Sequence, residues 1–88
     1  MKLDEIINEI EAHARNENHK SAFEVFKILD DNKNKELSFV VDSDWFKHYF
    51  VKLENLTHDN EESYNTDHFK REFSIIVSKI LYHLKKER

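Results

Sequence analysis

The chain contains no glycine and no proline among its 88 residues. Glycine supplies the left-handed backbone conformations of tight hairpin turns and phosphate-binding loops, and proline interrupts helices and strands. Walker and dinucleotide-binding loops are therefore excluded, because both depend on glycine at fixed positions. Connections between elements must instead use asparagine and aspartate, which tolerate the same turn conformations.

The length of the chain limits it to one globular domain, 1–88, because 88 residues cannot form two hydrophobic cores. There is no cysteine, so no disulfide can compensate for a small core. Apolar residues make up 39% of the chain and include seven Phe, three Tyr and one Trp. That much bulky apolar mass argues against wholesale disorder.

Apolar residues recur at helical spacing in four parts of the chain. The predicted helices are 3–15, 21–30, 43–56 and 67–86. The last is the most regular, because Phe69, Phe73, Ile76 and Ile80 are spaced by 4, 3 and 4 residues and form a short heptad seam. The sequence therefore predicts a mainly α fold, a small bundle of about four helices.

One segment between the predicted helices has the pattern of a strand. Leu37, Phe39 and Val41 alternate along the chain, as in a half-buried strand with one face toward a core. We therefore expect a short extended segment near 37–41.

An α+β fold with a β-hairpin at 22–41 is the alternative. It requires 22–29 to be extended and to pair with the predicted strand. Ser21 followed by Glu24 matches a capping box and favours a helix at this place instead. No glycine is available for the hairpin turn, which also argues against the alternative.

The sequence does not predict a metal or another cofactor. The polar loop that begins at Asp30 resembles an EF-hand calcium loop, with Asn32 and Asn34 at its third and fifth positions. However, Lys35 replaces the turn glycine and Val41 replaces the bidentate glutamate, so we expect an ordinary turn rich in Asn and Asp. The six histidines show no zinc-ligand spacing.

The sequence also lacks the patterns of an enzyme. No cysteine nucleophile exists, and a serine nucleophile elbow is impossible without glycine. The adjacent carboxylates Glu61 and Glu62 lie in a polar segment without apolar neighbours that would raise a pKa for acid–base work. We therefore expect a protein that is not an enzyme.

The net charge of −4 is unevenly distributed. Residues 1–31 carry a net −4, whereas residues 69–88 carry a net +4. We expect these two parts to attract one another inside the bundle. The basic C-terminal helix also suggests a nucleic-acid-binding regulator, but the net acidic domain argues against this alternative.

The segment before the last predicted helix combines acidic residues with an aromatic one. Asp59, Glu61 and Glu62 precede Tyr64 in one short polar segment, a composition typical of a surface that meets a basic partner. Trp45 is a candidate anchor, because tryptophan and tyrosine are enriched at binding hot spots. We therefore predict a small acidic protein-binding protein of the inhibitor, immunity or regulator type, which occupies the surface of a partner protein.

In size, net charge and expected number of helices the chain is similar to the colicin nuclease immunity proteins. It has no Asp-Leu-Ile-Tyr-Tyr-Pro stretch like theirs, so the resemblance assigns no site residues. The other alternative is a homo-oligomeric structural subunit, formed as a homodimer through spare apolar surface on 67–86.

Residue usage suggests the source of the chain, and its lack of targeting and membrane patterns suggests its location. It is rich in Asn, Lys and Ile and poor in Ala and Arg, as in proteins from AT-rich genomes. This favours a low-GC bacterium, or its phage or plasmid. The first residues have no signal-peptide pattern and no run of about 20 apolar residues occurs, so we expect a cytoplasmic protein without a membrane partner.

Overall fold

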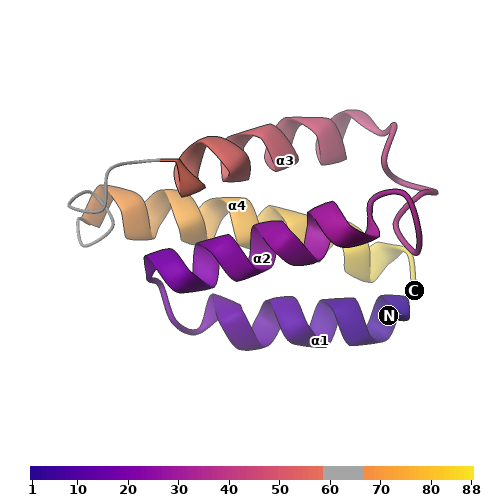
Figure 1. Cartoon of the computed structure of the whole chain (residues 1–88), viewed down its shortest axis with the longest axis horizontal. Coiled ribbons are helices and arrows are strands. Elements are labelled where there is room, and N and C mark those ends of the chain that lie inside the picture. The colour runs from indigo at the N-terminus through magenta and orange to yellow at the C-terminus, as the bar shows by residue number, and fades with distance from the viewer. Residues whose placement is uncertain (59–66) are drawn as a thin grey trace.

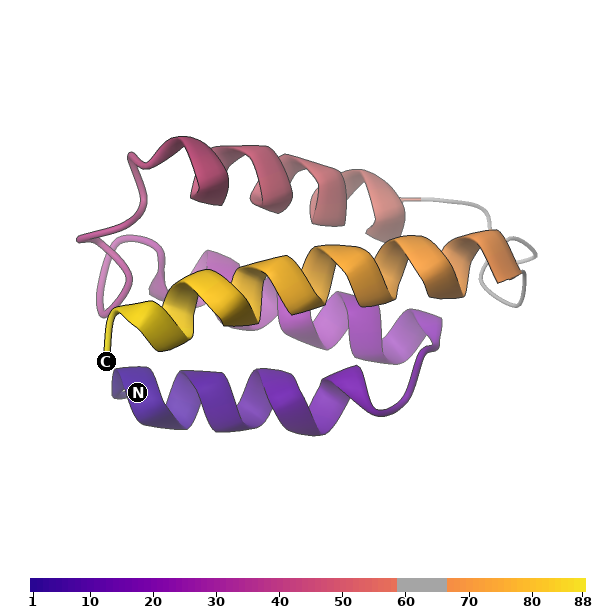
Figure 2. The same cartoon turned by 180° about the vertical axis from the view of Figure 1, so that it is seen from behind.

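The computed structural model describes residues 1–58 and 67–88, which form an up-and-down bundle of four helices. The helices are α1 (Leu3–Ala14), α2 (His19–Asn32), α3 (Asp44–Thr57) and α4 (Asp67–Lys86). Consecutive helices pack side by side and α4 returns against α1 (Figure 1). The same arrangement seen from behind places both chain ends at one end of the bundle (Figure 2). The predicted mainly α fold is confirmed.

The core lies where the inner faces of the four helices meet. α4 contributes six buried apolar side chains to it, more than any other described helix. They are Phe69, Phe73, Ile76, Val77, Ile80 and Leu84. The predicted heptad seam is therefore the buried face of α4, and the rings of its two phenylalanines stack with centroids 6.3 Å apart.

α2 begins earlier and ends later than the sequence predicts. The side chain of Asn18 caps the helix by accepting a hydrogen bond from the backbone N–H of Ser21 at 2.9 Å. Ser21 itself is buried inside the first turn, so the predicted capping box is wrong. At the other end the helix continues to Asn32, whose amide donates to the carbonyl of Ile28 at 2.8 Å.

The segment 33–43 is a series of turns, so the predicted extended segment is wrong and the hairpin alternative fails with it. The N–H of Val40 donates to the carbonyl of Leu37, and that of Ser43 to the carbonyl of Val40, each at 3.0 Å. Where each backbone N–H donates to the carbonyl three residues earlier, the side chains that face the core recur every three residues. Leu37 and Val40 are therefore buried, whereas Phe39 is 56% exposed.

The expected attraction between the acidic and basic parts of the chain is visible between α1 and α4. Lys85 lies 3.5 Å from the carboxylate of Glu11, and Arg88 lies 3.5 Å from that of Asp4. Both pairs are partly exposed, and each contributes about 0.2–1 kcal/mol. They join the outer edges of α1 and α4 on the side of the bundle where the two chain ends lie (Figure 2).

Candidate functional site

The contact residues predicted from the sequence fall into two places. Four lie outside the described residues: Asp59, Glu61, Glu62 and Tyr64. Trp45 lies in the first turn of α3 and is partly buried. A helix rises about 1.5 Å per residue, so Trp45 is about 18 Å from Thr57 at the other end of α3, where the chain continues toward the acidic residues. Trp45 is thus remote from the end of α3 that leads into the acidic segment.

The indole of Trp45 already has partners within the bundle. It stacks on the imidazole of His83 from α4, with ring centroids 4.6 Å apart and planes inclined by 9°. It also meets the ring of Phe46 edge to face at 5.7 Å. One face of the indole therefore joins α3 to α4, and that face is not available to a partner protein.

The outer face of α4 carries a row of exposed residues that the sequence analysis did not single out. Arg71, Ile75, Lys79, Tyr82 and Lys86 are spaced by 4, 4, 3 and 4 residues, so they lie along one side of the helix. We call this row the outer stripe of α4. Ile75 is 48% exposed and Tyr82 is 54% exposed, although both are large and mainly apolar.

The outer stripe is positively charged. Within the described part of the chain no carboxylate forms an ion pair with its cations Arg71, Lys79 and Lys86, in contrast to Lys85. The ammonium of Lys86 lies 4.3 Å from the centre of the Tyr82 ring. A hydrogen bond from Lys86 and the charges of Lys86 and Lys79 hold the pKa of Tyr82 below its ordinary value of 10.0.

The signal for the outer stripe was present in the sequence. Once 69–80 is taken as the buried seam, the residues on the opposite side of the same helix follow from its periodicity. By net charge alone the lysines and arginines of this region form one basic tail, and charge does not separate those that face α1 from those that face outward.

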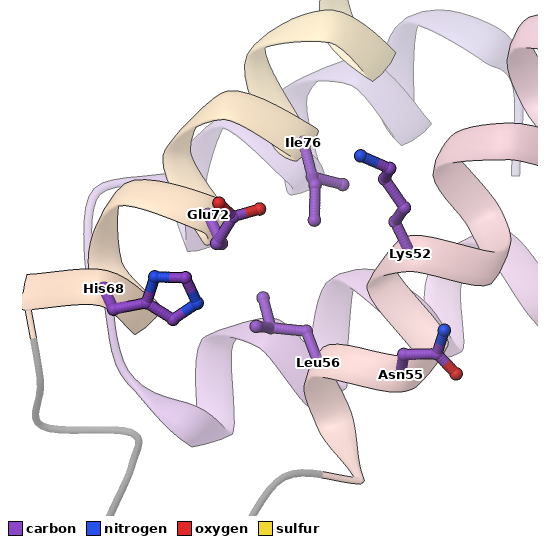
Figure 3. A pocket seen from close by; sticks show the side chains of 6 residues that line it. All are labelled: Lys52, Asn55, Leu56, His68, Glu72 and Ile76. Carbon is purple, nitrogen blue, oxygen red and sulfur yellow. The ribbon is translucent and has the colours of Figure 1, made fainter.

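A shallow pocket lies where α3 ends and α4 begins, with a volume of about 200 Å³. It is lined by Lys52, Asn55, Leu56, His68, Glu72 and Ile76. Figure 3 shows Lys52 reaching from α3, with Glu72 and His68 opposite on α4. Pockets that bind small molecules and cofactors enclose about 300–1,000 Å³. This pocket is below that range, and its dimensions suit a single side chain or a few water molecules.

Two residues of the EF-hand-like loop, Asp30 and Asn32, lie in the last turn of α2 and interact there. Asp30 pairs with Lys33 at 2.9 Å, and Asn32 holds the last turn through Ile28. Among residues 1–58 and 67–88, no group of three or more His, Asp or Glu side chains is placed to hold a metal ion. No helix in the same residues is long and apolar enough to cross a membrane.

Comparisons with protein-family models, with curated proteins and with solved structures each find no match. The function is therefore inferred from the surface of this molecule. Within the described residues, the outer stripe of α4 combines two exposed apolar side chains, Ile75 and Tyr82, with three cations that form no ion pair in the bundle.

Proposed function

We propose that the chain is a small protein-binding protein of the inhibitor, immunity or regulator type, which acts by occupying the surface of a partner protein. The observation that carries this proposal is the exposure of Ile75 and Tyr82 on α4, 48% and 54% respectively. The inner face of the same helix already supplies six buried apolar residues to the core. Protein interfaces combine an apolar core with a polar rim, and tyrosine is enriched at binding hot spots.

This role requires no catalytic group and no cofactor. When the folded surface of this chain covers the site that a partner protein uses, the partner can no longer bind its own substrate or target. Residue usage favours a low-GC bacterium, or its phage or plasmid, as the source of the gene, and the cytoplasm is the location we propose.

The acidic segment is a second predicted contact, for a partner with a basic surface. Its test is the double charge reversal Glu61→Lys/Glu62→Lys. We expect weaker binding and slower association without a loss of stability, because opposite charges steer encounter more than they hold a complex together. Unchanged affinity would remove this segment from the interface.

A homodimer through α4 is disfavoured by the charges of the outer stripe. If two copies of α4 pack antiparallel with Ile75 opposite Tyr82, then Arg71 lies opposite Lys86, because these pairs have the same sum of positions. Like charges directly opposed across an interface cost binding energy. Nucleic acid is also disfavoured, because the neighbouring helix α1 contains four carboxylates and no lysine or arginine.

The experiment that tests protein binding is affinity capture from the cells that make the chain, with three baits. The wild type is compared with Ile75→Ser/Tyr82→Ser and with the control Val51→Ser, because Val51 is 52% exposed on α3. We expect a stoichiometric partner with the wild type and the control and none with the double variant. A partner retained equally by all three baits would remove the outer stripe from the interface, and a stable homodimer with no partner would contradict the proposal.

A further inference from the structure

α4 carries an apolar seam on its inner side and, on the opposite side, the outer stripe, in which two apolar residues alternate with three cations. The inner seam, through Phe69, Phe73 and Ile76, is buried, and α4 packs mainly against α1 and α3. The outer stripe also recurs by three and four positions, and the 15 steps from Arg71 to Lys86 extend for about 22 Å along the helix. Residues that recur by three and four positions form the ridge against which a second helix packs. In the described structure nothing packs there.

The order of residue types in the outer stripe indicates what would fit it. Lys79 separates the two apolar residues Ile75 and Tyr82, and a cation follows each of them toward the ends of the stripe. A partner must therefore offer apolar side chains at two places one heptad apart and acidic side chains before, between and after them. An amphipathic helix provides this arrangement on one of its faces.

The positive charge of the stripe is not needed inside the molecule. The attraction between α1 and α4 uses Lys85 and Arg88, which pair with Glu11 and Asp4. The three cations of the outer stripe have no such partner among the described residues. Carboxylates from another molecule would complement them.

We infer that the outer stripe of α4 is a docking site for an acidic amphipathic helix of a partner protein. This inference rests on the proposed protein-binding function and adds the chemistry of the partner. Apolar side chains of the partner helix cover Ile75 and Tyr82, while its Glu and Asp side chains pair with Arg71, Lys79 and Lys86. Such rim charges add specificity and speed association, and the apolar contacts at the centre hold the complex.

Two synthetic 21-residue peptides serve as probes, both helical with leucine at heptad positions a and d. One carries glutamate at e and g, and the matched peptide carries lysine there. Each is titrated into the ¹⁵N-labelled chain and followed by the shifts of its backbone amides. We expect the acidic peptide to give saturable shifts centred on Arg71 to Lys86 and the basic peptide to give none there.

A charge-reversed variant tests the role of the cations. Arg71→Glu/Lys79→Glu/Lys86→Glu should weaken binding of the acidic peptide by about tenfold or more, because three exposed ion pairs of about 0.2–1 kcal/mol each become repulsive. The matched control reverses three exposed lysines away from α4, Lys20→Glu/Lys27→Glu/Lys35→Glu, and has the same net charge. Circular dichroism checks that both variants remain helical. Affinity that falls equally in the two variants would contradict a defined docking site.

Other outcomes would overturn the inference. These are no saturable shifts up to millimolar peptide, shifts centred on another helix, an equal response to the basic peptide, or shifts of the outer stripe produced instead by a DNA duplex or by phosphatidylglycerol vesicles. The experiments distinguish failure of this inference from failure of the proposed function. If a captured partner still binds after the triple charge reversal on α4, the chain binds proteins but does not dock an acidic helix at this site. If no partner is captured, both the proposed function and this inference fail.

Discussion

α1 and α4 lie side by side, and their inner faces are alike although their outer faces are not. Both helices bury bulky apolar residues in the same core. Outside, α1 exposes the residues that a solvated helix usually shows: Asp4, Glu5, Asn8, Glu9 and Ala12. α4 exposes Ile75 and Tyr82 between lysines and an arginine. The contrast shows that burial in this bundle accounts for the large apolar residues of α1, whereas α4 keeps two large apolar residues outside the core.

Truncations on the inner faces should have the largest effects and should be similar on the two helices. Phe73 and Ile7 are both fully buried, so Phe73→Ala should lower the free energy of unfolding by about 3–5 kcal/mol and Ile7→Ala by about 2–5 kcal/mol. Urea unfolding followed by circular dichroism measures both. If a truncated chain does not fold, Ile7→Val provides the milder change of about 0.5–1.5 kcal/mol. A Phe73→Ala cost below 1 kcal/mol would contradict the described core.

The turns between α2 and α3 show the same contrast between apolar residues that are buried in the core and apolar residues that are exposed. Leu37 is fully buried and Phe39 is 56% exposed. Leu37→Ala should therefore cost about 2–5 kcal/mol, while Phe39→Ala should stay within about 0.5 kcal/mol of the wild type. The same urea titrations give both values. A strand with Leu37 and Phe39 on one face would instead make the two costs similar.

The ion pairs that join α1 to α4 should contribute much less than either core residue. A double-mutant cycle with Glu11→Gln and Lys85→Gln should give a coupling energy of about 0.2–1 kcal/mol, because both side chains are partly exposed. The coupling should shrink as salt is added, since screening shortens the reach of exposed charges. Coupling above 2 kcal/mol, or coupling that salt does not change, would show that the pair is buried in solution.

Substitutions on the two outer faces should hardly change stability. Ile75→Ser and Tyr82→Ser on α4, and Ala12→Ser on α1, should each change the free energy of unfolding by about 0.5 kcal/mol or less, the difference that helix propensity alone predicts. Thermal unfolding provides the comparison. A larger loss on α4 than on α1 would mean that the outer stripe is used within the fold, and it would weaken the case for a partner.

The smallest effect concerns the titration of Tyr82. Lys86→Gln removes the hydrogen bond and the nearer charge, so the pKa of Tyr82 should rise toward 10.0, as followed by the ¹³C shift of its ring. Because the folded pKa lies below the unfolded one, the associated stability is present above the unfolded pKa and is lost as the pH falls through the folded pKa. No contribution is expected at neutral pH. Lys20→Gln is the control, and a Tyr82 pKa that does not respond to Lys86→Gln would contradict the contact.

The helices that the sequence predicted well are those with the strongest periodicity. The predicted 67–86 coincides with α4, and the predicted 43–56 differs from α3 by one residue at each end. The region from α2 to α3 was less predictable, because local patterns compete there. Alternation at 37–41 resembled a strand, yet no neighbouring strand exists among the described residues, and the backbone bonds close into turns instead.

The candidate site was harder to predict than the fold. Residue type alone marked Trp45 as a possible anchor, but its stacking on His83 depends on how α3 and α4 pack, which no local pattern shows. In the same way, Ile75 and Tyr82 became distinctive only when the bundle left them outside. A site made of exposed residues is defined by what the rest of the molecule does not cover, and that requires the tertiary structure.

The packing of α1 against α4 also has a consequence for how the chain reaches its fold. The other principal contacts join helices that follow one another, and such local pairings form at a small cost in chain entropy. The contact between the first and last helices brings together the segments that are farthest apart in the sequence. The Arg88–Asp4 pair joins the two ends of the loop that this contact closes. Folding kinetics should therefore depend most on this closure, and a short peptide link between the two ends would turn the slowest pairing into a local one.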